Sequence, residues 1–257
     1  MTTSKSHRRY FLRSSGLALL ASFSLLLASC GSTSSGSRGR SSGGLDEWGN
    51  RAGPRGFGTV VVDAGHGGKD SGAVSRRAGL VEKTLTLDLA RRLQSELRGS
   101  FRVVMVRDSD VFVDLDDRVR IANRKGNSVL VSLHFNAGSR RLAGPETYWW
   151  RVDSYSLATR VQRHLSGVAD QDNSRGLVRR RLRLTRNPKI PCILVEGGYI
   201  TNAREAKSLA DPAYRARLAR AIAAALREQA AEGDRGLGPL PAFISSPPSR
   251  HGDARSS

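Results

Sequence analysis

The sequence predicts an α/β fold: a single domain with a mostly parallel, twisted sheet flanked by helices. Short apolar runs typical of buried strands alternate along the chain with segments in which apolar residues recur at helical spacing, the pattern expected when helices connect parallel strands. This alternation occupies one stretch, residues 57–232 of 257. A stretch of that length suits one hydrophobic core.

The expected elements follow one another in order. A first strand at 59–62 is apolar and β-branched, as in sheets that are covered on both faces. A helix is expected at 84–97, because leucines recur there every four residues and form one apolar stripe. Further strands are expected at 102–106, 128–135, 148–152 and 193–195, and further helices at 115–123, 157–168 and 212–229.

Both ends of the chain have compositions that do not support a folded core. Residues 30–56 consist largely of Gly, Ser and Arg, and residues 233–257 are rich in Gly, Pro and Ser. Such segments bury too little apolar surface to offset the entropy of ordering the chain. We therefore expect a disordered tether before the domain and a disordered tail after it.

Residues 1–29 have the pattern of an export signal, with basic residues before an apolar run that is short for a membrane span. The sequence Leu27-Ala28-Ser29-Cys30 resembles the lipobox of bacterial lipoproteins, in which Cys30 would be acylated and become the mature N-terminus. The run at 8–13 also resembles a twin-arginine motif, so Sec and twin-arginine export both stay open. We expect an exported lipoprotein, anchored in a membrane and facing the periplasm or cell wall.

The formal net charge of +19 predicts an anionic partner. Four of the positive charges lie in residues 1–29, which leaves +15 after the signal. Basic proteins attract nucleic acid, anionic lipid or a carboxylate-rich wall, and export argues against nucleic acid. With Cys30 assigned to a lipid, Cys192 alone remains, so neither an intramolecular disulfide nor a Cys-rich zinc motif is expected.

Four side chains with acid–base or ligand chemistry are expected at one edge of the sheet. His66 follows the first strand, His134 and Glu196 end later strands, and Glu82 opens the first helix. Functional groups in open α/β sheets gather beyond the carboxyl ends of the strands. We therefore expect these four side chains to converge.

Two imidazoles and a carboxylate form a zinc ligand set that leaves an open fourth position, where the pKa of water falls to ~7. Hydrolysis needs a further carboxylate that takes a proton from the water and returns it to the leaving nitrogen. Glu196 is the remaining acid at the strand ends. Taken singly, each ligand has a structural alternative: His66 as a loop histidine, His134 as a core histidine, and Glu82 as an acid favoured by the helix dipole.

The segments that carry these residues resemble the catalytic domains of N-acetylmuramoyl-L-alanine amidases of the zinc-dependent, amidase-3 type. Similar segments run in order at 61–73, 80–83, 132–137 and 191–202. The resemblance implies that His66, Glu82 and His134 bind Zn²⁺ and that Glu196 is the catalytic carboxylate. It also implies that the enzyme hydrolyses the amide bond between N-acetylmuramic acid and L-alanine in peptidoglycan, in wall remodelling or daughter-cell separation. Whether a protein activator takes part is left open by the sequence.

Arg107, Asn136 and Arg186 are candidates for substrate binding, although a structural role is an equal alternative for Arg107. A second feature is the alternation of arginines with other residues at 179–184, which predicts a strand with three arginines on one face. They are Arg179, Arg181 and Arg183. That face either protects a sheet edge or gathers the carboxylates of stem peptides beside the zinc groove.

Two other functions stay open. The first is a zinc peptidase that cuts within the stem peptide, since the same machinery hydrolyses any amide that it can position. The second is a catalytically silent lipoprotein that binds the wall, which the presence of all four catalytic residues disfavours.

Overall fold

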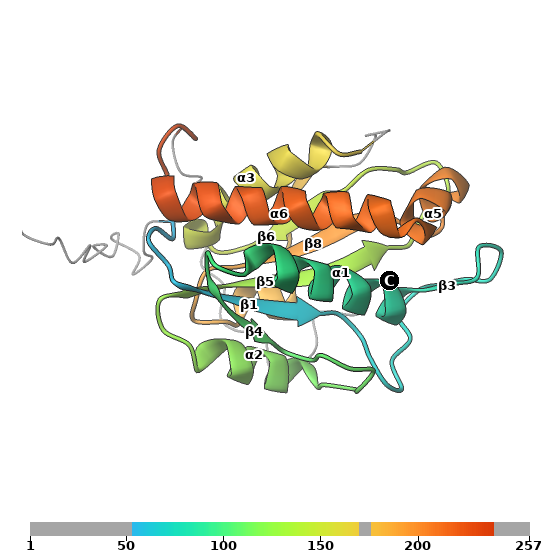
Figure 1. Ribbon diagram of the computed structural model, residues 1–257, viewed down its shortest axis with the longest axis horizontal. Coiled ribbons are helices and arrows are strands. Elements are labelled where there is room, and N and C mark those ends of the chain that lie inside the picture. The colour runs from blue at the N-terminus through green and yellow to red at the C-terminus, as the bar shows by residue number, and fades with distance from the viewer. Residues whose placement is uncertain (1–52, 170–175, 239–257) are drawn as a thin grey trace, which may run out of the picture. The chain divides into compact units, whose positions relative to one another are not determined.

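The computed structural model describes residues 53–169 and 176–238 of the chain (Figure 1). The expected signal, Cys30, and most of the expected tether and tail lie outside them. Within the described ranges, no helix is both long enough and apolar enough to cross a membrane.

The core is a six-stranded sheet with the order β4-β1-β5-β8-β6-β7. Its pairings are parallel except that between β6 and β8, which confirms the predicted mostly parallel sheet. The strands are β1 (Thr59–Ala64), β4 (Arg102–Met105), β5 (Ser128–Asn136), β6 (Glu146–Trp149), β7 (Leu177–Arg179) and β8 (Cys192–Tyr199). A separate hairpin, formed by β2 (Val74–Ser75) and β3 (Leu80–Val81), leads into the first helix.

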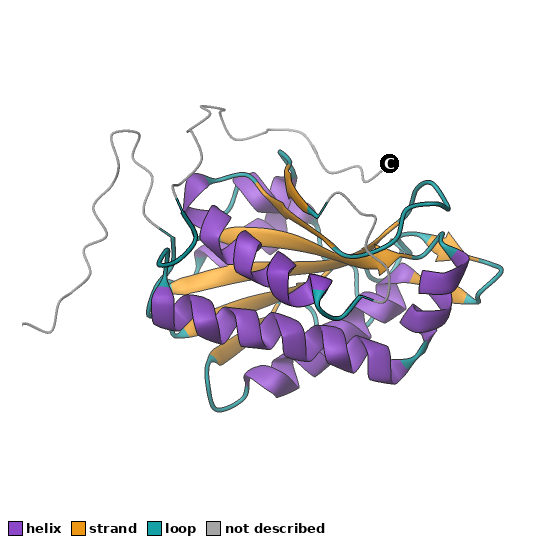
Figure 2. Cartoon of the chain, turned by 90° about the horizontal axis from the view of Figure 1, so that it is seen from above, coloured by secondary structure: helices purple, strands orange, loops and turns teal. Residues whose placement is uncertain are grey.

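Helices cover both faces of the sheet, as Figure 2 shows. The larger apolar cluster joins the sheet to α1 (Glu82–Leu97), α3 (Tyr155–Ser166) and α6 (Pro212–Glu232), and a smaller one joins it to α2 (Leu115–Asn123) and α4 (Arg183–Arg186). The predicted leucine stripe of α1 is buried in the larger cluster. Each buried leucine stabilises the fold by about 1.5–3 kcal/mol. The remaining helices are η1 (Val152–Ser154) and α5 (Ala203–Ala210).

Local signals fix where several helices begin. Asp211 accepts a hydrogen bond from the backbone N–H of Ala213, and Pro212 occupies the first turn of α6, as is usual for an N-cap followed by proline. Asn202 caps α5 by accepting from the N–H groups of Arg204 and Glu205. These caps fix the first residues of α5 and α6, the two helices that follow the last strand.

The prediction of a strand at 179–184 is wrong. β7 ends at Arg179 and a helical turn, α4, begins at Arg183. The reason is the Thr185 hydroxyl, which donates to the Arg180 carbonyl at 2.7 Å and accepts from the Leu182 N–H at 3.0 Å. These bonds close a turn that a period-two pattern does not reveal. β7 nevertheless lies at the edge of the sheet, as the edge-protection alternative for the arginines required.

The described structure extends a few residues past both expected domain boundaries. The Gly56 N–H donates to the carbonyl of Ala230 in α6 at 2.8 Å, and the Gly53 N–H donates to Asp234 at 2.9 Å. Residues 53–56 and 233–238 therefore lie against each other at the end of α6.

Candidate metal centre

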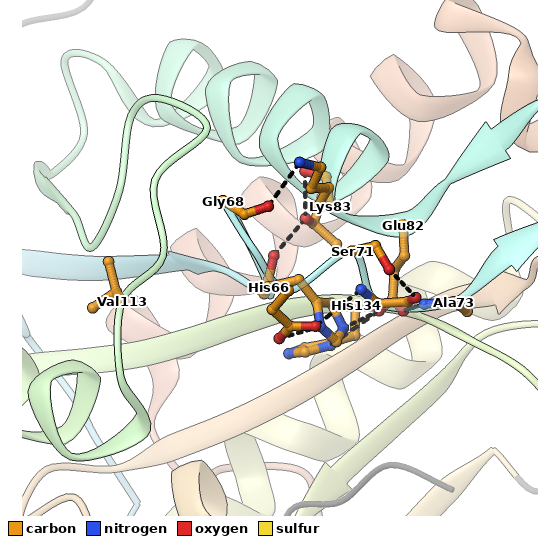
Figure 3. A network of polar contacts seen from close by, with 12 residues as sticks. His66, Gly68, Ser71, Ala73, Glu82, Lys83, Val113 and His134 are labelled. Atoms are coloured by element: carbon orange, nitrogen blue, oxygen red, sulfur yellow. Dashed lines mark hydrogen bonds and ion pairs between the residues drawn. The ribbon is translucent and has the colours of Figure 1, made fainter.

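Three side chains from separate elements converge beyond the carboxyl ends of β1 and β5. His66 follows β1, Glu82 begins α1 and His134 lies near the end of β5. The Glu82 Oε1 atom lies 2.9 Å from His66 Nε2 and 3.1 Å from His134 Nδ1, and the two nitrogens are 3.1 Å apart. Figure 3 shows the three side chains pointing toward one another. The sequence-based expectation of convergence is met for these residues.

The backbone around His66 is held by two buried arginines. Arg118 donates to the His66 carbonyl at 2.7 Å and pairs with Asp63 at 2.6 Å. Arg107 donates to the carbonyls of Ala64 and Gly65 at 2.8 Å and 2.7 Å. Because Arg107 is 3% exposed and its guanidinium is bonded to backbone, the contacts observed for it are structural ones. His66 itself has a φ of 61°, a conformation that L-residues adopt only when their surroundings enforce it.

Glu82 is held by backbone donors as well as by the histidines. Its Oε2 accepts from the Ala73 N–H at 2.8 Å, and its Oε1 accepts from the Phe135 N–H at 3.1 Å. Burial alone would raise the pKa of Glu82, but the side chains of His134 and His66, when they are protonated in the absence of a metal, outweigh it and hold that pKa well below its usual range. The carboxylate is therefore ionised at neutral pH and available as a ligand.

Asp70 orients His66 from the other side of the ring. Its Oδ2 lies 2.8 Å from His66 Nδ1, and its Oδ1 accepts from the Gly72 N–H at 3.0 Å. A carboxylate on one ring nitrogen keeps the proton there, so that the other nitrogen presents its lone pair. Gly72 has a φ of 63°, and a Cβ there would lie 2.6 Å from Glu82 Oε2, so this turn requires glycine.

The donor set fits a zinc ion. Zinc binds histidine nitrogen and carboxylate oxygen at about 2.0–2.2 Å, so tetrahedral ligand atoms lie roughly 3.3–3.6 Å apart. The three observed separations are 2.9–3.1 Å, a few tenths of an ångström shorter, so small side-chain shifts would admit the ion. With Asp70 on His66 Nδ1, the Nε2 lone pair of His66, the Glu82 carboxylate and the Nδ1 atom of His134 face one point, an arrangement suited to a cation.

Glu196 lies beside this centre on the next strand. It pairs in register with His134 across β5 and β8, so the two side chains emerge from the same face of neighbouring strands, whose backbones are about 4.8 Å apart. Glu196 lines a cavity of about 640 Å³ that His66, His134 and Asn136 also line. All four predicted catalytic residues therefore belong to one site, in which Glu196 lies outside the three-residue ligand cluster.

A buried polar network beside Glu196 was not anticipated from the sequence. Glu146 is fully buried and pairs in register with Glu196. It accepts from the hydroxyls of Tyr148, at 2.6 Å, and Tyr199, and the Asn136 side chain donates to the Tyr148 hydroxyl at 3.1 Å. The available signal was the spacing of Glu146 and Tyr148, which puts both on one face of a strand.

The arginines of 179–183 do not form one face toward the cavity. Arg180 lines the cavity, and its guanidinium lies 5.6 Å from the centre of the Tyr148 ring. Arg179 instead lies over the Trp149 ring, and Arg183 pairs with Asp116. Arg186 is buried at the end of α4 and is not among the residues that line the cavity. The sequence-based assignment of that face to Arg179, Arg181 and Arg183 is therefore wrong.

Comparisons of this chain with a family model, with curated proteins and with solved structures all point to one family. Residues 60–228 match the amidase-3 family model, described as N-acetylmuramoyl-L-alanine amidase. The chain is 34% identical over 171 residues to the N-acetylmuramoyl-L-alanine amidase LytC of Bacillus subtilis (strain 168), an alignment of 64% of this chain with 34% of LytC. It is 28% identical over 214 residues to the probable amidase AmiB of Haemophilus influenzae, covering 63% of this chain and 49% of AmiB. The chain thus spans about a third to a half of these two relatives.

Two solved structures are similar over nearly their whole length. The catalytic domain of CwlV, an N-acetylmuramoyl-L-alanine amidase from Bacillus (Paenibacillus) polymyxa var. colistinus, superimposes with a TM-score of 0.63 and 36% identity, covering 67% of this chain and 97% of that one. The N-acetylmuramoyl-L-alanine amidase AmiC2 of Nostoc punctiforme gives a TM-score of 0.64 and 36% identity, covering 68% and 97%.

The contact between Asp70 and His66 predicts an effect on metal affinity. Asp70→Asn keeps the shape of the side chain but removes the charge that makes His66 a better ligand, so zinc affinity falls about 10- to 100-fold. Competition against a chelator measures this change. Ser71→Ala, at the neighbouring exposed position, is the control and keeps wild-type affinity. Equal affinities for Asp70→Asn and wild type would refute the role of Asp70.

Proposed function

This chain belongs to the amidase-3 family of N-acetylmuramoyl-L-alanine amidases, and we propose that it hydrolyses the amide bond between N-acetylmuramic acid and L-alanine in peptidoglycan, with one zinc ion bound by His66, Glu82 and His134. One observation carries the proposal: the three ligand atoms lie within 4.8 Å of one another, beside a cavity that Glu196 also lines. A cavity of about 640 Å³ is within the usual range for small-molecule sites.

Zinc in such a set supplies a Lewis acid, which lowers the pKa of water to about 7 and polarises a carbonyl oxygen. The protein residues supply the rest. Glu196, on the strand next to His134, takes a proton from the attacking water and returns it to the leaving nitrogen. Asp70 keeps His66 in the ligating tautomer, and the backbone donors on Glu82 fix its carboxylate.

The amidase reaction is favoured over the two alternatives. A silent wall-binding protein has no need of the precise arrangement in which two histidines, two glutamates and Asp70 face one site. A zinc peptidase would use the same groups, but the two solved relatives, which this chain covers to 97%, are N-acetylmuramoyl-L-alanine amidases. The two activities differ in which amide enters the site.

The reaction is tested by digesting purified cell wall and identifying the new amino termini. The full-length protein with zinc releases intact stem peptides that begin with L-alanine. Glu196→Gln releases them about 10²- to 10⁴-fold more slowly, because the step loses its general base, yet it binds one zinc per chain as the wild type does. His134→Ala loses both zinc and activity, because it removes a ligand.

Other products would contradict specific parts of the proposal. New termini within the stem peptide would identify a peptidase. Wild-type turnover by Glu196→Gln would show that Glu196 is not the general base. Full zinc binding by His134→Ala would show that His134 is not a zinc ligand.

We further propose that the enzyme acts outside the cytoplasm as a lipid-anchored protein. The support is the signal pattern of residues 1–29 followed by Cys30, which lies outside the described structure. Cys30→Ala removes the acylation site, so the exported protein is expected in the soluble fraction. A high-salt wash of isolated membranes separates lipid anchoring from charge attraction. Retention of the variant on washed membranes would exclude Cys30 as the anchor.

A further inference from the structure

A second groove lies at the same end of the domain as the metal centre. Its walls are the β2–β3 hairpin, the loop after β5 and α5, and its volume is about 910 Å³. Figures 1 and 2 both place the hairpin and α5 at one end of the molecule. The groove shares no lining residue with the cavity that Glu196 lines.

The groove carries an unbalanced positive charge. Four cationic side chains line it, and all are exposed: Arg76, Arg77, Arg140 and Lys207. Within the described ranges, no acidic residue lines the groove and none of these four cations belongs to an ion pair. Elsewhere, arginines such as Arg118 and Arg215 are paired with aspartates. Four like charges around one hollow raise the local potential and attract an anion.

The hairpin links the groove directly to the metal centre. The Ala73 N–H donates to Glu82 at 2.8 Å, and Val74, the next residue, lines the groove with 49% of its surface exposed. Arg76 and Arg77 lie in the turn that follows β2, three and four residues after Ala73, so their backbones are at most about 14 Å from Ala73. An extended peptide of four or five residues spans up to about 17 Å, so a peptide with its first amide at the metal centre reaches these arginines.

We propose that this cationic groove binds the free carboxylates of peptidoglycan stem peptides and thereby positions the first amide of the peptide at the metal centre. The inference rests on the proposed function and adds a peptide subsite to it. Guanidinium groups suit this ligand because their planar fork matches a carboxylate. The exposed Val74 offers apolar contact to small side chains of the peptide. The groove thus takes the carboxylate-gathering role that was one of the two alternatives for Arg179, Arg181 and Arg183.

The test measures wall binding by variants that do not digest the wall. All proteins are full-length, zinc-loaded and carry Glu196→Gln. The groove variant adds Arg76→Gln, Arg77→Gln, Arg140→Gln and Lys207→Gln. The matched control adds Arg98→Gln, Arg102→Gln, Arg124→Gln and Arg220→Gln, which remove the same charge at exposed positions outside the groove. Zinc content and the thermal unfolding temperature verify that both variants fold.

Three wall preparations separate the possible ligands. The first is wall stripped of phosphodiester polymers, the second is the same wall with its carboxylates converted to amides, and the third retains its phosphodiester polymers. On the first, the groove variant is expected to bind about 10-fold or more weakly than its parent at low salt, with a flatter salt dependence. On the amidated wall the difference disappears, and the control variant binds the first wall as its parent does.

Each other outcome overturns the inference. If the control variant bound the wall as weakly as the groove variant, the loss of binding would be due to net charge and not to the groove. A loss seen only on wall that retains phosphodiester polymers would assign the groove to those polymers. Binding of the groove variant at parental strength would remove the groove from substrate recognition. Because the parent carries Glu196→Gln, these results do not depend on cleavage, whereas failure of the wild-type digest would refute the proposed function separately.

Discussion

The convergence of His66, Glu82 and His134 is the constraint on which the site depends. Placing three potential ligand atoms within 4.8 Å of one another costs free energy unless a proton or a cation lies among them. The cost arises because each atom has lost the water that solvated it. The protein offsets this cost with backbone donors on Glu82 and with Asp70 on His66. Zinc at the centre would satisfy all three groups at once, which makes metal binding and local order parts of the same equilibrium.

The sheet supplies the rigid frame that this convergence requires. His134 and Glu196 lie in register on adjacent central strands, so their separation is set by backbone hydrogen bonds rather than by loop geometry. His66 lies on a loop, but Arg107, just after β4, and Arg118, on α2, hold that loop through buried bonds to the backbone carbonyls of residues 64–66. Removing one partner of the buried pair between Arg118 and Asp63 would leave an uncompensated charge, at a cost of about 3–5 kcal/mol. Stability and function are thus coupled around His66.

Sequence patterns predicted the elements whose residues repeat regularly. The leucine stripe of α1 and the apolar run of β1 gave nearly the observed bounds, and α2 matched at both ends, with Asp114 as its N-cap. The hairpin of β2 and β3 was missed because each strand has two residues, too few to show a period. The turn at 180–185 was missed because one hydroxyl, that of Thr185, decides it.

The candidate site followed the same division. His66, Glu82, His134 and Glu196 were predictable because strand ends and a helix start share one edge of the sheet. Glu146 was not, because its partners Tyr148, Tyr199 and Asn136 come from three strands whose register only the fold defines. The cationic groove likewise combines a hairpin, a loop and a helix, which no single segment of sequence reveals.

If one zinc ion is bound by three side chains while Glu196 remains available for proton transfer, anomalous diffraction at the zinc absorption edge from crystals of the zinc-loaded protein will show it. One strong peak is expected at bonding distance, about 2.0–2.2 Å, from His66 Nε2, His134 Nδ1 and a Glu82 oxygen, with the Glu196 carboxylate outside that distance. A peak bonded to Glu196 in place of Glu82, or no peak at this cluster, would contradict this assignment.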